Sequence, residues 1–410
     1  MITVIDSPCG RGKTTYAINL INANPTKNFI YIAPLLDQLN DVIDRTSATL
    51  GTTKKVKAPR LVQPYADRNT SETKTSTLIE YLNKNKDIAS THALFKKCTK
   101  ELLEILKASH YTLILDEVMN VVESYPIKED DLQRLIKSGG ITIDKTGKIT
   151  WTDVSTDDRY NDIQELAKSG LLYLVDNKVI MWTFPVNIFK AFDKVIICTY
   201  MFNAQIQRLY YDMFNVSYEL KSVFNGELID YAPEKDSVNK IHFLDDHKIN
   251  TIGDGEYDLS WSWYQKHKSK LPALKANMYN FSHNIIPRAV NHGKIIKSDY
   301  IFWTTYEDFE RDLKGRGYSK RFLACNTRAL NTYRHCYVVM YPINRFFNPE
   351  VKKFFQQHGV EINKKVEEEF ALSEMIQFIW RSAIRDNKDI YVYIPSKRMR
   401  RLLNYYINEY

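Results

Sequence analysis

The chain has 410 residues, of which 44% are hydrophobic and 26% charged, and this composition indicates a globular protein of two or three domains. The sequence has no apolar run near the roughly 20 residues of a membrane span and begins directly with a strand-like segment, so we expect no membrane helix, no signal peptide and a cytoplasmic location. The net charge of +8 suits an anionic partner without being specific for nucleic acid, and five cysteines without a CxxC pair favour reduced thiols over a zinc site.

The first predicted elements are a strand, a glycine-containing loop and a helix. Residues Ile2 to Ile5 are apolar, and apolar side chains recur at helical spacing from Ala17 to Ile21. Between them, Ser7 to Thr14 has the spacing of a phosphate-binding loop, although Ser7 replaces the usual first glycine. In such a loop the backbone N–H groups face a polyphosphate, the lysine reaches the terminal phosphates and the hydroxyl binds Mg²⁺. The residues predicted to bind nucleotide here are Ser7, Gly10, Arg11, Gly12, Lys13, Thr14 and Thr15.

Strand and helix patterns alternate after the loop. Residues 29–34 predict a strand that ends at Pro34, and the helix expected over 35–43 contains Gln38. Residues 87–95 predict a short strand that runs into a further helix. This alternation predicts a parallel sheet with helices on both faces.

Another apolar strand is predicted at 111–115, and Asp116 and Glu117 follow it directly. Carboxylates at the C-terminal end of a buried strand lie in the same crevice as a phosphate loop in a doubly wound sheet. We expect Asp116 to bind the nucleotide through Mg²⁺, so the predicted metal residues are Thr14 and Asp116. Glu117 is expected to orient and polarise the water that attacks the γ-phosphate.

The stretch 120–194 is longer than one connection between neighbouring strands requires. Within it, residues 140–151 form two alternating segments around a glycine-containing turn, which predicts a hairpin. We therefore expect an insertion in the first domain, followed by a buried strand at 195–200. The segment 206–297 is the least informative, because its interleaved aromatic and basic residues fit either a stacking surface for single-stranded nucleic acid or, as we favour, a linker packed on a core.

The C-terminal third is predicted to contain strands at 299–305, 321–326 and 336–341. Further along, Gln377, Arg381 and Arg385 are spaced four apart, so on a helix they would share one face. Two guanidiniums arranged in this way can stabilise the charge that develops in phosphoryl transfer.

Ser396 is a predicted N-cap that places Lys397 and Arg398 in the first turn of the last helix. The helix dipole disfavours cations there unless an anion lies nearby. These two side chains are therefore either phosphate-binding residues or part of a solvated basic face.

The order of these motifs resembles that of superfamily 2 helicases, most closely small bacteriophage-encoded helicases of the DEAD/DEAH type. The matching segments are the phosphate loop, Ala33-Pro34 with Gln38, Ser90-Thr91-His92, Asp116-Glu117, Thr199, 321–331 and 377–385. The resemblance implies an α/β fold of two RecA-like domains with parallel sheets, a β-hairpin-containing insertion in the first domain, and ATP with Mg²⁺ held between the domains. Catalytic roles are implied for Lys13, Glu117, Arg381, Arg385 and Gln377. Nucleic-acid contacts are implied for Pro34, Gln38, Thr91, His92, Thr199, Thr304, Asn326, Arg328, Lys397 and Arg398.

The expected domains are 1–205 for the first RecA-like domain with its insertion at about 120–194, 206–297 for a linker or accessory segment, and 298–410 for the second RecA-like domain. The resemblance implies an ATP-hydrolysing DNA helicase or translocase that acts on single-stranded or forked DNA in phage replication or recombination, in the host cytoplasm. It also implies replication proteins as partners, and we favour a monomer. Two alternatives stay open: a phage DNA-packaging ATPase, and an NTP-dependent nucleic-acid-binding switch or loader that unwinds nothing.

Overall fold

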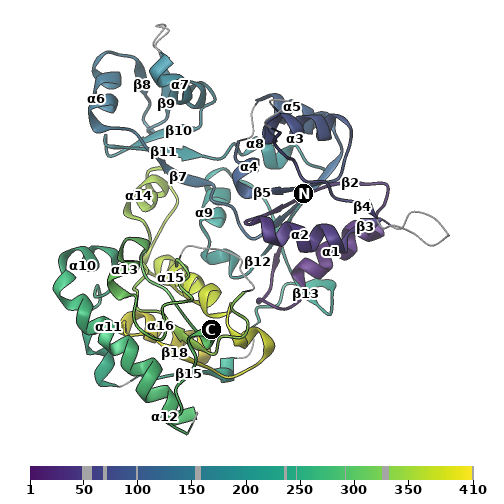
Figure 1. Cartoon of the computed structure of the whole chain (residues 1–410). Helices are drawn as coiled ribbons and strands as arrows, with labels where there is room; N and C mark the ends of the chain where they lie inside the picture. Colours follow the sequence, from purple (N-terminus) through teal and green to yellow (C-terminus); the bar gives the residue numbers. More distant parts are fainter. Residues whose placement is uncertain are drawn as a thin grey trace, which may run out of the picture. The chain divides into compact units, whose positions relative to one another are not determined.

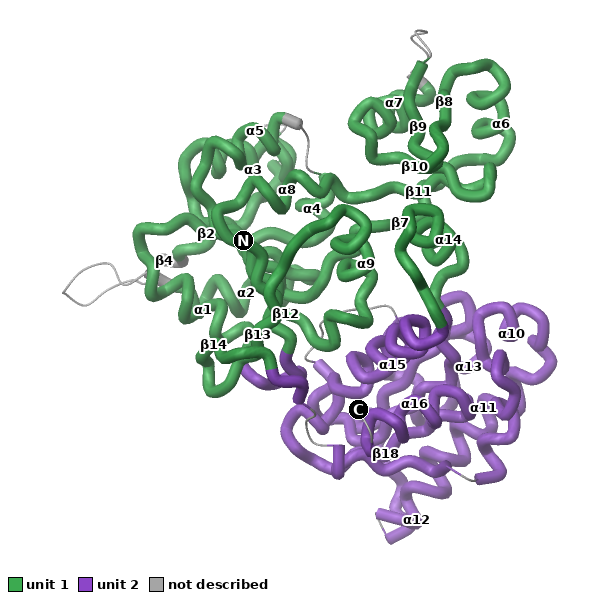
Figure 2. Tube along the Cα trace, turned by 180° about the vertical axis from the view of Figure 1, so that it is seen from behind, with its two compact units in different colours: residues 1–6, 13–231, 347–363 green, residues 7–12, 232–346, 364–410 purple. Residues whose placement is uncertain are grey.

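The computed structural model describes residues 1–48, 58–67, 72–97, 100–152, 158–234, 238–245, 247–290, 292–325 and 332–408. The chain divides into two compact units (Figure 2). Unit 1 comprises Met1–Asp6, Lys13–Tyr231 and Phe347–Asn363, and unit 2 comprises Ser7–Gly12, Ala232–Phe346 and Lys364–Tyr410. No helix among the described residues is both long and apolar enough to cross a membrane.

The main sheet in the described part of unit 1 has seven strands in the order β14-β13-β1-β12-β6-β2-β5 (Figure 1). The strands are β1 (Ile2–Asp6), β2 (Asn28–Ala33), β5 (Ile88–Thr91), β6 (Tyr111–Asp116), β12 (Lys194–Thr199), β13 (Glu219–Phe224) and β14 (Glu227–Asp230). All neighbouring strands are parallel except β13 and β14. Every residue of β1 and β6 is buried, as expected for central strands of a parallel sheet covered on both faces. The sheet predicted from the alternating pattern is confirmed.

Helices of unit 1 connect these strands and bury their apolar faces against the sheet. On the first helix, Ala17 and Ile21 belong to the same core cluster as Ile5 and Tyr31. This packing anchors the amino end of that helix at the carboxyl end of β1. The helices are α1 (Lys13–Ala23), α2 (Leu36–Arg45), α3 (Lys74–Asn83), α4 (His92–Phe95), α5 (Lys100–Ala108), α8 (Asn187–Lys190) and α9 (Ile206–Met213). The short strands β3 (Ser47–Ala48) and β4 (Ala58–Pro59) pair in antiparallel orientation.

The insertion between β6 and β12 has a core of its own. Its elements are β7 (Val122–Tyr125), α6 (Glu129–Lys137), β8 (Ile141–Ile143), β9 (Ile149–Trp151), α7 (Asn161–Lys168), β10 (Leu172–Val175) and β11 (Val179–Thr183). The strands β10, β11 and β7 form an antiparallel sheet, and β8 pairs with β9 as the predicted hairpin. Gly147 has a φ of +83° at the turn of this hairpin, a conformation that favours glycine.

A helix from much later in the chain, α14 (Pro349–Gln357), packs on the insertion and belongs to unit 1. The Phe354 ring meets the Tyr173 ring edge-on at 5.4 Å between centroids. The Gln357 side chain donates a hydrogen bond of 2.9 Å to the Thr146 carbonyl, and Ser124 donates one of 2.9 Å to Glu350. No local pattern predicts this pairing, because its partners are more than 170 residues apart in the chain.

Unit 2 contains a four-stranded parallel sheet in its described part, in the order β15-β18-β17-β16. The strands are β15 (Ile241–Phe243), β16 (Ile301–Trp303), β17 (Val338–Met340) and β18 (Ile390–Tyr393). The strand expected at 321–326 is reduced to a single bridge between Trp303 and Phe322. The α-helices are α10 (Trp261–Lys266), α11 (Leu271–Asn280), α12 (Ile286–Val290), α13 (Glu310–Leu313), α15 (Lys364–Ile379) and α16 (Lys397–Asn408).

The segment 206–297 is shared between the two units. Its first part supplies α9, β13 and β14 to unit 1, and its second part supplies β15 and α10 to α12 to unit 2. The segment therefore contributes strands to both sheets.

Candidate nucleotide site

The phosphate-loop segment has the local structure that its sequence predicts. It joins β1 to α1, which begins at Lys13. Gly10 and Gly12 have φ values of +93° and +89°, a region that glycine enters without the steric penalty of a Cβ atom. Lys13 is 8% exposed, and the first N–H groups of α1 lack partners within the helix, so this end is suited to binding an anion. Within unit 2, Arg11 Nε lies 3.2 Å from Glu234 Oε2.

Asp116 and Thr14, the two predicted metal residues, are linked by a side chain that the sequence reasoning missed. The fully buried Tyr31, on β2, donates a hydrogen bond of 2.8 Å to Asp116 Oδ2, and the Thr14 side chain also hydrogen-bonds Tyr31. Burial, and then the Asp116 charge, raise the pKa of the Tyr31 hydroxyl well above its usual value. Tyr31 therefore keeps its proton and acts as a donor to Asp116.

Glu117 leaves β6 in an unusual backbone conformation. Its φ is +72°, its N–H donates to the Cys198 carbonyl at 2.8 Å, and its carboxylate accepts a hydrogen bond of 3.2 Å from Thr199 Oγ1. A non-glycine residue in this region costs on the order of 1–3 kcal/mol, and such costs concentrate at functional sites. Glu117 and Thr199, predicted separately, are thus in contact.

Asp6, at the end of β1, is a second residue that the sequence reasoning missed. Its two carboxylate oxygens accept hydrogen bonds from the backbone N–H groups of Met201 at 2.7 Å and Phe202 at 3.0 Å. Burial raises the pKa of Asp6, while these N–H groups and the charge of Lys13 oppose the rise. Asp6 thus ties the strand before the phosphate loop to the turn after β12.

A third missed residue, Gln207 on α9, supports the chain just after Glu117. Its Oε1 accepts a hydrogen bond of 2.8 Å from the Met119 N–H, and its Nε2 donates to Tyr211 at 2.9 Å. Gln207 is completely buried. Gln207 lies 88 residues after Met119 on another element, so no local pattern predicts this contact.

The predicted nucleic-acid residues of unit 1 lie at or just after the carboxyl ends of β2, β5 and β12. Pro34 comes directly after β2, Gln38 lies on α2, and His92 begins α4. Thr91 caps α4 by accepting a hydrogen bond of 3.4 Å from the Leu94 N–H. Because β2 and β5 are neighbours, the sheet brings these segments together, and whether they contact nucleic acid stays a prediction.

The prediction that one helix carries Gln377, Arg381 and Arg385 on a shared face is wrong. Only Gln377 lies on the helix. The helix α15 ends at Ile379, so that Arg381 lies in a turn and Arg385 lies in a 3₁₀ helix over Ala383–Asp386. The Ser382 hydroxyl donates to the Ile379 carbonyl at 2.7 Å, and the Ala383 N–H donates to Cys336 at 2.8 Å. These bonds replace those of a continuing helix. The proposed chemical roles of these residues do not depend on a shared helix face.

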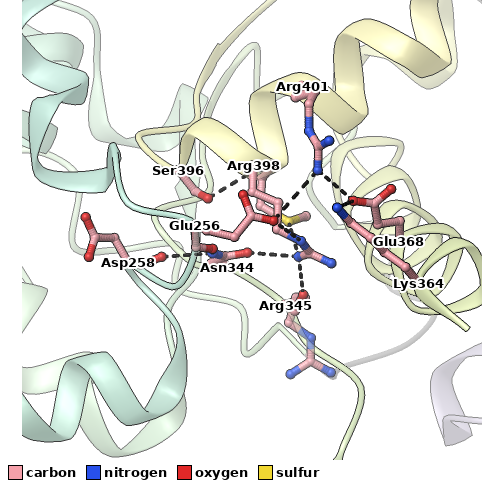
Figure 3. Close-up of polar contacts among 10 residues, drawn as sticks. Glu256, Asp258, Asn344, Arg345, Lys364, Glu368, Ser396, Arg398 and Arg401 are labelled. Atoms are coloured by element: carbon pink, nitrogen blue, oxygen red, sulfur yellow. Dashed lines mark hydrogen bonds and ion pairs between the residues drawn. The ribbon is translucent and has the colours of Figure 1, made fainter.

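The last predicted basic pair divides between surface and interior, and Figure 3 shows the polar contacts of its buried member, Arg398. Ser396 caps α16 as predicted, accepting a hydrogen bond of 3.3 Å from the Met399 N–H. Arg398 is 3% exposed and donates to Asn344 Oδ1 at 3.0 Å and to the Arg345 carbonyl at 2.7 Å, whereas Lys397 is exposed. In this structure Arg398 therefore stabilises unit 2 and does not present its guanidinium to solvent.

Of the three further nucleic-acid contacts predicted in unit 2, the structure describes only the one at Thr304. Thr304 is fully buried beyond the end of β16. Asn326 and Arg328 lie outside the described residues.

The fold and the candidate site together define an α/β phosphate-loop protein with RecA-like architecture. A solved chain described as XPD in its apo form matches with a TM-score of 0.50 at 13% identity, covering 98% of this chain and 95% of that one. The structure of S. tokodaii Xpd4 matches with a TM-score of 0.48 at 11% identity, covering 99% and 93%. The first of these likenesses supports the fold.

Sequence comparison identifies the family. The chain is 38% identical over 419 residues to the SPbeta prophage-derived uncharacterized protein YonV of Bacillus subtilis (strain 168), covering 98% of this chain and 97% of that protein. Family models of the YonV middle domain and the YonV C-terminal Rossmann-like domain match residues 122–182 and 235–407. The chain belongs to the YonV family.

Proposed function

We propose that this protein is an ATP-dependent nucleic-acid motor of the superfamily 2 helicase type, acting on DNA. The observation that carries the proposal is the convergence of Lys13, Thr14, Asp116 and Glu117 at the carboxyl ends of β1 and β6, two parallel strands that lie on either side of β12. XPD, whose fold this chain resembles, is a superfamily 2 helicase, and the relative in Bacillus subtilis is prophage-derived, which supports a phage setting.

The residues of the site have chemically distinct roles in ATP hydrolysis. Lys13 and the first N–H groups of α1 would bind the β- and γ-phosphates. Thr14 and Asp116 offer the hard oxygen ligands that Mg²⁺ prefers, with phosphate oxygens and water completing its shell. When bound, Mg²⁺ would neutralise part of the phosphate charge.

Glu117 is the proposed general base. Its carboxylate accepts a proton from the attacking water while the water oxygen bonds to the γ-phosphorus and the bond to the β-phosphate oxygen breaks. The products are ADP and inorganic phosphate, and the proton passes from Glu117 to solvent. Thr199 holds one oxygen of Glu117, which leaves the other to face the water.

Coupling to nucleic acid would pass through the segment after β12. Thr199 contacts Glu117, and Met201 and Phe202 donate to Asp6, so both ends of this turn are bonded to the candidate site. A change in Glu117 on phosphate release would therefore reach the turn directly. Thr199 is also one of the positions at which the helicase resemblance implies a nucleic-acid contact.

A strand-displacement assay tests the motor proposal. Duplex DNA with 3′ or 5′ single-stranded tails, and the matching RNA, would be incubated with the protein, ATP and Mg²⁺, with Lys13→Ala and EDTA as controls. We expect ATP-dependent displacement from one tail polarity of DNA. Nucleotide-dependent DNA binding without displacement or translocation would favour the switch or loader alternative.

Arg381→Ala is expected to lower turnover while ATP still binds. We propose that Arg381 approaches the γ-phosphate during the cycle, and loss of such an arginine costs about 10³–10⁵ in kcat. Single-turnover hydrolysis and the Kd of a fluorescent ATP analogue separate the two effects. Arg381→Lys controls for charge, and circular dichroism controls for folding because Arg381 is buried. Weakened binding without a selective loss of turnover would exclude the arginine-finger role.

Tyr31→Phe is expected to weaken the response to Mg²⁺. Removing the hydroxyl takes away the donor that orients Asp116, and loss of such a supporting bond typically costs about 10–100-fold in metal affinity. Mn²⁺ binding to the ADP complex, followed by electron paramagnetic resonance, measures this effect independently of turnover. Tyr111→Phe is the matched control, since Tyr111 donates to the Lys86 carbonyl from the opposite end of β6. Equal Mn²⁺ affinity in wild type and Tyr31→Phe would show that the hydroxyl has no role at the metal.

A further inference from the structure

Two segments, which belong to unit 2 except for residues 347–349, lack acidic residues and hold more than the whole net positive charge of the chain. The segments 259–298 and 313–349 together have 77 residues. At the chain's average of 49 Asp and Glu in 410 residues, about nine acidic residues would be expected in them, but neither segment contains any. They contain 14 Lys and Arg, whereas the whole chain has a net charge of +8, so the remainder has a net charge of −6. The basic character of the protein is therefore localised.

The structure brings the two segments into contact at His283 and Gly317. The first segment forms α11, a π-helical turn over Phe281–Ile285 and α12 as consecutive helical elements, and the second passes beside this turn. Gly317 has a φ of +84°, and a side chain at this position would begin 2.0 Å from His283 Nε2. Glycine is required for this approach, which places Arg316 next to the helix.

One face of this helix combines basic and aromatic side chains. Lys275, Tyr279 and His283 are four residues apart and so follow one another along the helix surface. The Tyr279 and His283 rings are stacked, with 4.3 Å between centroids and an interplanar angle of 8°, and Tyr279 is 41% exposed. Burial lowers the pKa of His283, which keeps its ring neutral near pH 7.

Three basic side chains on and beside this run of helical elements are available to an external anion. Arg316, beside the stack, and Arg288, further along on α12, are exposed and Lys275 is partly exposed, and within the described residues none of the three forms an ion pair. The helix α13, which packs against α11, carries Glu310, Arg311 and Asp312 and so has a net charge of −1, smaller than the combined charge of the three cations. An exposed ring among unpaired cations is the arrangement that binds single-stranded nucleic acid.

We propose that Lys275, Tyr279 and Arg316, with Arg288 further along the same run of helical elements, form a nucleic-acid-binding surface on unit 2, separate from the positions where the helicase resemblance implies contacts. The cations bind the backbone phosphates of a single strand, and Tyr279, supported by His283, stacks on a base. This inference deepens the proposed function, since it names the surface through which the motor would hold its strand.

Salt-dependent binding of the full-length protein to fluorescent oligo(dT), without nucleotide, tests the surface. The variant Lys275→Ala/Arg288→Ala/Arg316→Ala is expected to reduce the slope of log affinity against log salt by about 2, because each phosphate contact on a single strand contributes about 0.7. Tyr279→Ala is expected to weaken binding by about 5–150-fold, the equivalent of about 1–3 kcal/mol of stacking, with Tyr279→Phe close to wild type. The matched control, Lys137→Ala/Lys178→Ala/Lys190→Ala, removes three exposed charges from unit 1 and should leave the slope unchanged.

The outcomes separate this inference from the proposed motor. Unchanged slope and affinity in the basic triple variant would overturn the surface even if the wild type hydrolyses ATP. Loss of binding in the triple variant of a protein that hydrolyses no ATP would support the surface and contradict the motor. Binding to phosphatidylserine vesicles but not to oligo(dT), lost in the same variant, would assign the surface to an anionic membrane and overturn the nucleic-acid assignment.

Discussion

Glu117→Gln lowers the rate of ATP hydrolysis by about 10²–10⁴-fold and leaves ATP affinity close to wild type, because the amide keeps the size of the side chain but cannot accept the proton of the attacking water. The substitution preserves an oxygen for the bond from Thr199, so the geometry of the site should persist. Backbone strain is also retained, since glutamine meets the same cost as glutamate at a φ of +72°.

Rapid-quench single-turnover kinetics, with a fluorescent nucleotide for affinity, measure this prediction. Lys13→Ala is the contrasting variant, because it removes a phosphate ligand and should weaken binding itself. The hydrolysis rate of Thr199→Val is expected to lie between those of wild type and Glu117→Gln, because this substitution removes the hydrogen bond to the Glu117 carboxylate but keeps the carboxylate itself. Turnover of Glu117→Gln within a few-fold of wild type would show that another residue activates the water.

Asp6→Ala destabilises the folded protein by about 2–5 kcal/mol, because it leaves the buried N–H groups of Met201 and Phe202 without an acceptor and each such group costs about 1–3 kcal/mol. This effect concerns the support of the site and not its chemistry. Asp6→Asn keeps one acceptor oxygen and is expected to lose about half as much. Met201 has a φ of +56°, a conformation that costs free energy for a non-glycine residue, so the turn needs the hydrogen bonds to Asp6 to hold it.

Urea unfolding of nucleotide-free protein, followed by circular dichroism, gives the stability difference. The control is Asp193→Ala, because Asp193 is an exposed carboxylate whose side chain lies 3.2 Å from His110 at the surface, where ion pairs contribute about 0–1 kcal/mol. If Asp6→Ala unfolds at the wild-type urea concentration, the two N–H groups have another acceptor and Asp6 does not hold the turn.

The sequence was sufficient for those parts of the site that depend on local pattern. The phosphate loop requires small residues with a lysine and a hydroxyl at fixed spacing, so Gly10, Gly12 and Lys13 could be assigned directly. Asp116 and Glu117 follow a uniformly apolar run that had to be a buried strand. The parallel order of the sheet then brought these motifs to one edge, as the alternation of strands and helices predicted.

Residues whose roles depend on distant partners could not be predicted in this way. Tyr31 occupies a strand where an aromatic residue has an ordinary packing role, and only the placement of β2 beside β6 brings its hydroxyl to Asp116. Asp6 resembled a strand end, although its position immediately before the loop was a usable signal. Arg381 was placed on a helix because spacing alone does not show that the Ser382 hydroxyl and Cys336 carbonyl take over the bonds that would extend it.

Steady-state ATP hydrolysis with and without single-stranded DNA tests the central claim most directly. We expect Mg²⁺-dependent turnover that rises with added oligo(dT) and is lost in Lys13→Ala and Glu117→Gln. Hydrolysis that neither DNA nor RNA stimulates would contradict a nucleic-acid motor, and the absence of any hydrolysis above Lys13→Ala would contradict the assignment of the site itself.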